Sequence, residues 1–205
     1  MLKIWGRLSS VNVQKVMICV NELRLPHERI DAGGKFGTVD TPAYRKLNPN
    51  GLVPVIEDGD FVLWESNTIV RYLARKHATG SLYPADLKQA MLAERWMDWQ
   101  ATQLNPALGG AFIQLIRTPE VQRDMAVVQK SIQQSETAMA VLDAHLAGRE
   151  FVAGAFSMGD IPLACSVHRW FGLPCERQPR PNALSWLDRV KARGSSEAVL
   201  TLPVV

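Results

Sequence analysis

The chain has 205 residues, of which 47% are hydrophobic and 21% charged, a composition close to the average of globular proteins. This length allows one large domain or two small ones. The formal net charge of +3 comes from 23 basic and 20 acidic residues. Because these charges are spread along the chain and form no basic stripe, a nucleic acid is not an expected partner.

The apolar residues form no run of about 18, so we expect no membrane-spanning helix. The opening residues MLKIWGRLSS are too short for a signal peptide, which predicts a soluble protein of the cytoplasm. The cysteines, Cys19, Cys165 and Cys175, are odd in number and have neither CxxC nor metal-ligand spacing. We therefore expect reduced thiols, no disulfide framework and no metal site.

Strands and helices are predicted to alternate at the start of the chain. Leu2 and Ile4 alternate with polar neighbours, as in a short strand. Apolar residues then recur at helical spacing behind Ser10 and Asn12, either of which is a natural N-cap. The sequence HERID, at 27–31, reads as a second strand, and strands joined through a helix are normally parallel.

Turn signals place a short helix and a hairpin next. Thr41 and Pro42 have the cap-then-proline order that opens a helix. The apolar runs VPVIE and FVLW flank the turn sequence DGD, the pattern of a hairpin, and Ser66 then caps another helix. Residues 1–77 therefore read strand, helix, strand, short helix, strand, strand, helix.

Residues 78–86 carry a glycine and a proline between two helical patterns, as a linker does, and no strand pair is expected beyond them. Asp86 can cap the next helix. Thr118 and Pro119 are expected to open a long helix that Gly148 ends. One face of that helix is expected to hold Val121, Met125, Val128, Ile132, Met139, Leu142 and Leu146.

Ser157 and Asp160, in the sequence SMGD, have the spacing of a cap and an acidic residue that bond reciprocally in the first turn of a helix. A buried helix is expected to begin there. Pro181 is expected to open a last helix, which Gly194 ends. Its inward residues are expected to be Leu184, Trp186, Leu187 and Val190. Residues 87–205 thus predict an all-helical domain.

The segment NPNGLVPVIEDGDFVLWESNTIVRYLARK, with Pro54 at the start of the third strand, resembles the glutathione-binding segment of cytosolic glutathione S-transferases. The SMGD box resembles the capping motif of that family's helical domain, and SSVNVQKV and DAGGKFG look like bacterial members. The resemblance implies an α/β plus all-α fold. Residues 1–77 would form a thioredoxin-like glutathione-binding domain, residues 78–86 a linker and residues 87–205 an all-helical domain.

The resemblance also implies how glutathione is held. Pro54 is expected to be cis, which turns the backbone of Val53 toward the cysteinyl part of the ligand. Ser66 would give its hydroxyl and backbone amide to the γ-glutamyl carboxylate at a helix N-terminus, where an anion is favoured. Glu65 would accept from the α-amino group, and Lys35 would pair with the glycyl carboxylate.

Catalysis in this family raises the fraction of glutathione that is a thiolate. A hydroxyl at the positive end of the first helix would stabilise the sulfur anion. Counted back from the following residues, Ser10 matches the serine of theta-like members and is the expected donor, whereas Ser9 matches the zeta-like pattern. Asn12 also lies where a donor could sit. No tyrosine or cysteine stands in this stretch, which argues against the tyrosine, omega and beta types.

Asp98 resembles the acidic residue that reaches the γ-glutamyl amine in the partner subunit, so a homodimer is expected. The electrophile pocket is expected between the domains. Its apolar candidates, each of which could instead be a core residue, are Trp99, Phe112, Leu115 and Trp170.

The resulting hypothesis is a detoxifying transferase that uses glutathione as co-substrate against small hydrophobic electrophiles. A glutathione-dependent peroxide or disulfide reductase and a noncatalytic ligand-binding or dimerisation module are the alternatives. The sequence leaves open the physiological electrophile, the choice between conjugation and reduction, and the residue that contacts the sulfur.

Overall fold

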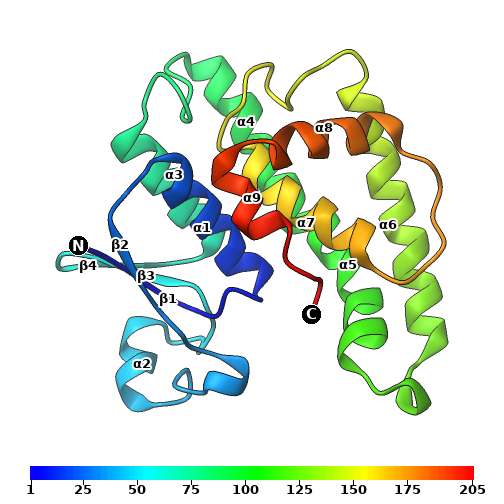
Figure 1. Ribbon diagram of the computed structural model, residues 1–205, viewed down its shortest axis with the longest axis horizontal. Helices are drawn as coiled ribbons and strands as arrows, with labels where there is room; N and C mark the ends of the chain where they lie inside the picture. Colours follow the sequence, from blue (N-terminus) through cyan, green and yellow to red (C-terminus); the bar gives the residue numbers. More distant parts are fainter.

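Short strands and helices alternate in the first part of the computed structural model, which describes residues 1–205 (Figure 1). The elements in chain order are β1 (Leu2–Trp5), α1 (Val11–Glu22), β2 (His27–Ile30), the 3-10 turn η1 (Gly34–Phe36), α2 (Pro42–Leu47), β3 (Val55–Asp58), β4 (Phe61–Trp64) and α3 (Ser66–His77). This is the order that the sequence predicts, and it is that of a thioredoxin-like domain.

The four strands form one sheet in the order β2-β1-β3-β4. The β1–β2 pair is parallel, as expected of strands joined through a helix, and the other two pairs are antiparallel. Helices α1 and α3 cover one face of the sheet and α2 lies on the other (Figure 1). The buried residues of the sheet therefore lie on its two central strands, β1 and β3, whereas the outer strands β2 and β4 have none.

Alternation along the strands sends neighbouring side chains to these two faces. Ile4 and Ile56 are fully buried in the large core beneath α1 and α3. Val55, next to Ile56, joins a second and smaller core with Ala32 and Tyr44 under α2.

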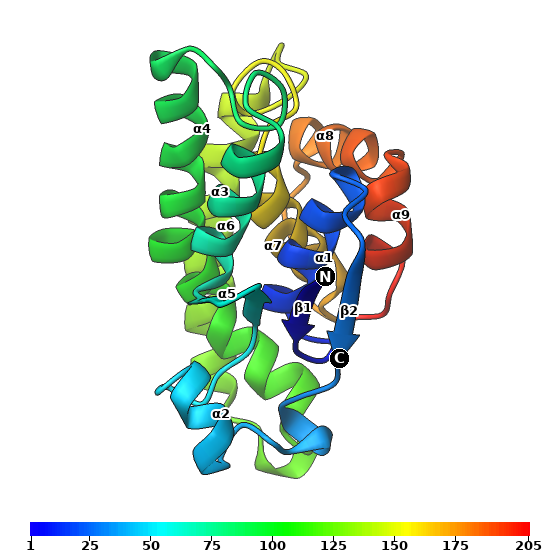
Figure 2. The same cartoon turned by 90° about the vertical axis from the view of Figure 1, so that its left-hand side faces the viewer.

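The remainder of the chain is helical. Its elements are α4 (Leu87–Trp99), the π-helical segment η2 (Gln100–Leu104), α5 (Asn105–Phe112), the π-helical segment η3 (Ile113–Arg117), the 3-10 turn η4 (Glu120–Gln122), α6 (Met125–Leu146), α7 (Asp160–Gly172), α8 (Pro181–Lys191) and α9 (Gly194–Leu200). The first four run on as one long rod, which packs along α6 (Figure 2). None of the helices combines the length and the apolar character that crossing a membrane requires.

The start of α7 is anchored by Asp160, which is fully buried. Its carboxylate accepts from the backbone N–H of Ser157 at 3.0 Å, as the SMGD spacing predicts, whereas the Ser157 hydroxyl accepts from Gly159 N–H at 3.3 Å. The same carboxylate also accepts from Val152 N–H at 3.0 Å and from the Trp186 indole N–H at 2.9 Å. One buried acid thus joins a loop, α7 and α8.

The two parts of the chain meet along α1, which packs against α3 on one side and against α7 and α9 on the other. At the end of α1, Glu22 forms an ion pair with Arg193, and the Asn21 amide donates to the Ser195 carbonyl at 3.2 Å. Helix α9 therefore closes the chain back onto the sheet domain, with the last residues between the two halves (Figure 1).

The predicted start of the long helix is wrong. Thr118 and Pro119 precede only the short turn η4, and α6 begins after Asp124, whose carboxylate accepts from the N–H groups of the first turn. Val121 and Met125 are therefore 94% and 52% exposed instead of buried.

The prediction for the last helix is wrong in its face and in its end. Leu184 is 46% exposed, and Ala183 takes the inward position. Helix α8 ends at Lys191, and Gly194 begins the further helix α9, which the sequence reading missed.

Candidate functional site

One edge of the sheet gathers the residues that the sequence singled out. Val55 pairs with Trp5 on β1 and with Trp64 on β4, and Trp5 pairs with Ile30 at the end of β2. The residues that follow or precede these four positions therefore leave the sheet at the same edge. They are the turn before α1, the loop that carries Lys35, the Val53–Pro54 bond and the start of α3.

The Val53–Pro54 peptide bond is cis, as expected. The preceding carbonyl, of Leu52, accepts from the Tyr44 hydroxyl and from the Asn48 amide, each at 2.9 Å, so α2 holds this loop in place. The amide and carbonyl of Val53 have no hydrogen-bond partner within the chain. Val53 therefore offers a free donor and a free acceptor at the sheet edge, which suits an extended peptide-like ligand.

Glu65 and Ser66 face this bond across the β3–β4 pair. Glu65 has φ +73°, a backbone region that side chains disfavour, and its exposed carboxylate has no partner in the chain. Ser66 is the first residue of α3 and is only 6% exposed, so its N–H belongs to the unpaired donors of the helix N-terminus. The pair offers an acceptor for a cation next to donors for an anion.

A buried lysine, which the sequence reading missed, lies directly behind Ser66. Lys15 is 3% exposed, and its ammonium donates to Ser66 Oγ at 3.4 Å, Asn67 Oδ1 at 3.1 Å and Gln100 Oε1 at 3.1 Å. No carboxylate forms an ion pair with it, and burial lowers its pKa from 10.5 to about 8. Its position four residues from both Val11 and Cys19, on the buried stripe of α1, was the signal that could have found it.

The three candidate sulfur donors surround the N-terminus of α1. Ser10 is the N-cap, but its side chain makes no capping hydrogen bond and its hydroxyl is free. The Ser66 hydroxyl donates to Asn12 Oδ1 at 3.4 Å, so Asn12 is tied to the start of α3. Ser9 lies on the wall of a neighbouring hollow.

That hollow has a volume of about 630 Å³ and opens between the sheet edge and the helical part. It is lined by Arg7, Ser9, Gly34, Lys35, Phe36, Ile116, Arg117, Val204 and Val205. Gly33 and Gly34 have φ +77° and +58°, and a Cβ on either would come within 3.1 Å of the Arg7 guanidinium. These glycines therefore let the loop close over Arg7. Lys35 is exposed, with its ammonium 5.1 Å from the Phe36 ring centre.

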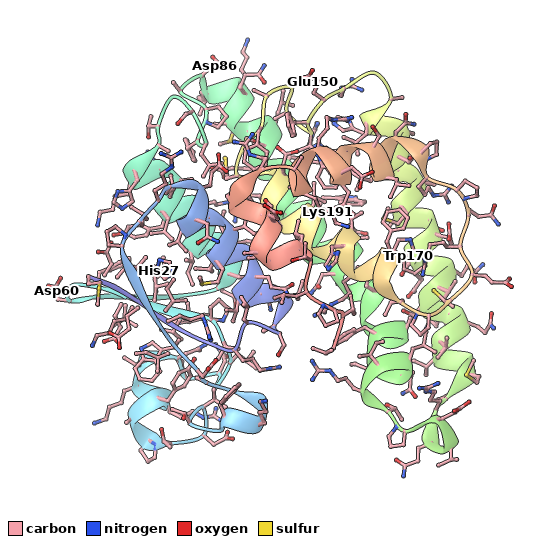
Figure 3. All side chains as sticks on the ribbon, viewed as in Figure 1. His27, Asp60, Asp86, Glu150, Trp170 and Lys191 are labelled. Atoms are coloured by element: carbon pink, nitrogen blue, oxygen red, sulfur yellow. The ribbon has the colours of Figure 1, made fainter.

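The apolar lining expected from the sequence needs correction. Trp170 is fully buried in the core of the helical part, on α7 (Figure 3). Trp99 lines a different hollow of about 440 Å³ between the long rod and α6. Neither reaches the sheet edge, because each helix turns these large rings toward its helical neighbours.

The other two apolar candidates, Phe112 and Leu115, lie near the hollow but do not line it. Phe112 is 9% exposed and packs its ring against the Arg169 guanidinium at 3.8 Å, and Leu115 is half-buried against the core. Ile116 and Arg117, at the end of the same rod, line the hollow instead. Phe112 and Leu115 thus belong to the same rod as two lining residues of this hollow but do not line it themselves.

Asp98 lies apart from these residues, on α4. Its exposed carboxylate forms an ion pair with Arg71 of α3, which is also 3.5 Å from Glu94. No group of three or more His, Cys, Asp or Glu side chains is arranged to hold a metal ion.

A thioredoxin-like sheet with a cis-proline edge, joined to an all-helical second half, defines a protein of the glutathione transferase class. The family model of the glutathione S-transferase N-terminal domain matches residues 5–81. Glutathione S-transferase GstB of Escherichia coli is 38% identical over the full length of both chains, and glutathione S-transferase 3 of Zea mays is 34% identical over 93% of this chain and 86% of the relative.

Solved structures agree. The glutathione-bound theta class glutathione S-transferase of Xanthomonas axonopodis pv. citri superposes with a TM-score of 0.96, at 41% identity, over 100% of this chain and 99% of the other. The chain belongs to the glutathione S-transferase family. The fold and the family expected from the sequence are both confirmed.

Proposed function

We propose that the protein activates glutathione as a thiolate and transfers it to small electrophiles that enter the hollow beside α1. Family membership makes the protein an enzyme, a glutathione transferase with glutathione as its co-substrate, as the sequence predicted. No observation favours a reductase or a noncatalytic module.

Glutathione lies along the sheet edge in this proposal. Its cysteinyl part pairs with the free amide and carbonyl of Val53, beside Pro54. Its γ-glutamyl carboxylate accepts from the amide and hydroxyl of Ser66, and its α-amino group donates to Glu65. Lys35, at the opposite end of the edge, pairs with the glycyl carboxylate. The single observation that carries the proposal is the set of unpaired backbone groups of Val53 opposite the start of α3.

The sulfur then lies near the N-terminus of α1, where Ser10 donates a hydrogen bond to it. Support comes from the free Ser10 hydroxyl and from the helix N-terminus, which favours an anion. A free thiol has a pKa of about 8.5, and lowering it by about two units takes roughly 2.7 kcal/mol. Ser9 and Asn12 are the neighbours that could share this role. Asn12 would donate through its side-chain N–H₂ group, and its Oδ1 would lose the hydrogen bond from Ser66 when that hydroxyl donates to the γ-glutamyl carboxylate.

We propose a homodimer as well. Large apolar side chains stay exposed on β4 and α4, namely Phe61, Trp64, Leu87, Met91 and Leu92, and Leu87 is 71% exposed. Symmetric dimers are the commonest way for a soluble protein to cover such a surface. Asp98, exposed on the same helix, would reach the ligand of the partner subunit. A monomeric mass in light scattering at micromolar concentration would contradict this part.

The cellular setting that we propose is detoxification in the cytoplasm. All three cysteines are free and two of them are buried, which suits a reducing compartment. We also keep the division into a glutathione-binding domain at 1–77, a linker at 78–86 and a helical domain at 87–205.

Calorimetry with glutathione tests the binding mode. Ser66→Ala should weaken binding about tenfold, because a buried charge-assisted hydrogen bond is lost. Ser81→Ala, which removes a hydroxyl from the linker, is the matched control. Equal affinities of the two variants, or no binding by the unaltered protein at millimolar glutathione, would contradict the assignment.

A further inference from the structure

We infer that the hollow beside α1 selects anionic electrophiles, namely small apolar molecules that carry a carboxylate or sulfonate, and that Arg7 and Arg117, with Arg169 behind them, bind that group. This inference rests on the proposed function and adds a substrate class to it. It comes from the charge of the hollow, which the family resemblance did not predict.

The wall of the hollow is positively charged and has no acidic residue. Arg7, Lys35 and Arg117 supply three cationic side chains, and no lining side chain is acidic. Several positive charges around a concave surface raise the local concentration of anions. A volume of about 630 Å³ is typical of pockets that bind small molecules.

Arg7 is available to a ligand. Its side chain lies against the backbone of the Gly33–Gly34 turn and has no hydrogen bond or ion pair with any residue of the chain. Burial lowers its pKa, and the charge of Arg117 lowers the pKa further, so the two guanidinium groups repel each other across the hollow. An anion between them would remove this repulsion.

Arg169 adds a third guanidinium from α7. It lines a smaller recess that shares Ser9, Val204 and Val205 with the main hollow. It is half-buried over the Phe112 ring and has no carboxylate partner. Its pKa is lowered to about 10, chiefly by burial and then by the charges of Arg117 and Arg7. Arg117 contributes a hydrogen bond to the Val205 carbonyl at 2.7 Å and keeps its remaining donors for a ligand.

Glutathione does not account for this charge. In the proposed binding mode its two carboxylates are taken by Ser66 and Lys35, so glutathione pairs with none of Arg7, Arg117 and Arg169. Ser9 joins the hollow to the N-terminus of α1, so an electrophile held by these arginines lies next to the position proposed for the sulfur.

A matched pair of substrates tests the inference, namely 4-chloro-3,5-dinitrobenzoate and its uncharged methyl ester. In both, the thiolate sulfur forms a bond to the ring carbon that carries chlorine, and chloride leaves with the bonding electron pair. The carboxylate takes no part in the bond changes, so it reports binding alone. Each enzymatic rate is divided by the uncatalysed rate with glutathione, which removes the difference in ring reactivity.

The unaltered protein should enhance the reaction of the acid more than that of the ester. Arg7→Gln and Arg117→Gln should each lower kcat/KM for the acid about tenfold, through KM, and change the ester by less than about twofold. Lys130→Gln, which removes one exposed cation from α6, should change neither. The KM for glutathione should stay constant in all three variants.

Equal losses for acid and ester, or a rise in the KM for glutathione in place of that for the acid, would overturn the inference. Turnover of the ester without preference for the acid would also overturn the inference but leave the proposed function standing. No turnover of either substrate would contradict the proposed function itself.

If a glutamine variant does not fold, the salt dependence of the unaltered protein tests the inference instead. Raising the ionic strength from about 0.02 to about 0.3 M should lower the acid rate severalfold and spare the ester, and no such difference would refute the inference.

Discussion

The ammonium of Lys15, on α1, donates to the hydroxyl of Ser66, on α3, at 3.4 Å, and so places a buried cation directly behind the proposed carboxylate site. The same ammonium donates to Gln100 at the end of α4, and the Gln100 amide donates to Ser166 of α7 at 2.8 Å. One side chain thus connects the sheet domain, the site and two helices of the second half.

Replacing this cation should weaken glutathione binding. Lys15→Met keeps most of the side-chain volume but removes the positive charge behind Ser66, so we expect the Kd for glutathione to rise about tenfold. Lys46→Met, on the exposed end of α2, is the matched control. Calorimetry measures both variants, and an unchanged Kd in Lys15→Met would show that the buried charge does not act on the ligand.

The pH dependence of stability gives a second test of Lys15. Its folded pKa is about 8, below the usual 10.5, so the unfolded chain binds the proton more tightly. Burying the charged ammonium therefore lowers the free energy of unfolding by roughly 3 kcal/mol at any pH below about 8. This loss is recovered as the pH rises from 8 to 10.5, because the folded chain releases the proton before the unfolded chain does. Between pH 8 and pH 10, the free energy of unfolding of the unaltered protein should rise relative to that of Lys15→Met, as measured by urea unfolding. A constant difference would contradict the lowered pKa.

Local sequence signals predicted the secondary-structure elements correctly where a capping residue or a turn by itself determines where the element begins or ends. Thr41 accepts from the Tyr44 N–H at 3.2 Å and Asp86 from the Gln89 N–H at 2.9 Å, as expected of N-caps. Thr118 and Pro119 have the same pattern as Thr41 and Pro42, yet only a short turn follows. The pattern permits a helix start, and packing decides where the long helix begins.

The edge proposed to bind glutathione could be named from the sequence because it is built from neighbouring residues, with Pro54 and Ser66 at the two ends of one hairpin. The wall of the hollow was not predictable, because Arg7, Arg117 and Val205 come from distant parts of the chain. Only the packing of the long rod and the chain end against the sheet brings them together. Buried polar contacts such as that of Lys15 with Gln100 have the same origin.

Asp160 should be necessary for the stability of the helical part. It accepts four hydrogen bonds, and Asp160→Asn would turn an N–H₂ group toward at least one buried donor. We expect a loss of about 2 to 4 kcal/mol in the free energy of unfolding. Asp188→Asn, on the exposed side of α8, should stay within about 0.5 kcal/mol of the unaltered protein. Urea denaturation compares them, and similar midpoints would contradict the anchoring role.

The strained backbone at Glu65 should lower the stability of the fold, while the Glu65 side chain contributes to glutathione binding. A side chain at φ +73° is strained, and glycine relieves this strain, so Glu65→Gly should raise the free energy of unfolding by about 1 kcal/mol. Glu65→Gln keeps the strain and removes only the charge, and its stability should not change. Both variants should weaken glutathione binding, because each lacks the carboxylate proposed for the α-amino group. Equal stability of the two variants, measured by urea unfolding, would rule out strain at this position.

Ser10 gives the sharpest test of the proposed chemistry. Its hydroxyl is not used by the helix that it begins, so Ser10→Ala should leave the fold and the affinity for glutathione nearly unchanged. The pKa of the bound thiol should rise, because the hydroxyl stabilises the anion more than the neutral thiol. Losing one charge-assisted hydrogen bond costs about 1.5 to 3 kcal/mol, which lowers turnover roughly ten- to hundredfold where thiolate formation limits the rate. Thiolate absorbance against pH, with Ser9→Ala and Asn12→Ala as matched variants, measures the effect. A raised pKa in one of those two variants and not in Ser10→Ala would move the role to that neighbour, because all three residues surround the same helix N-terminus.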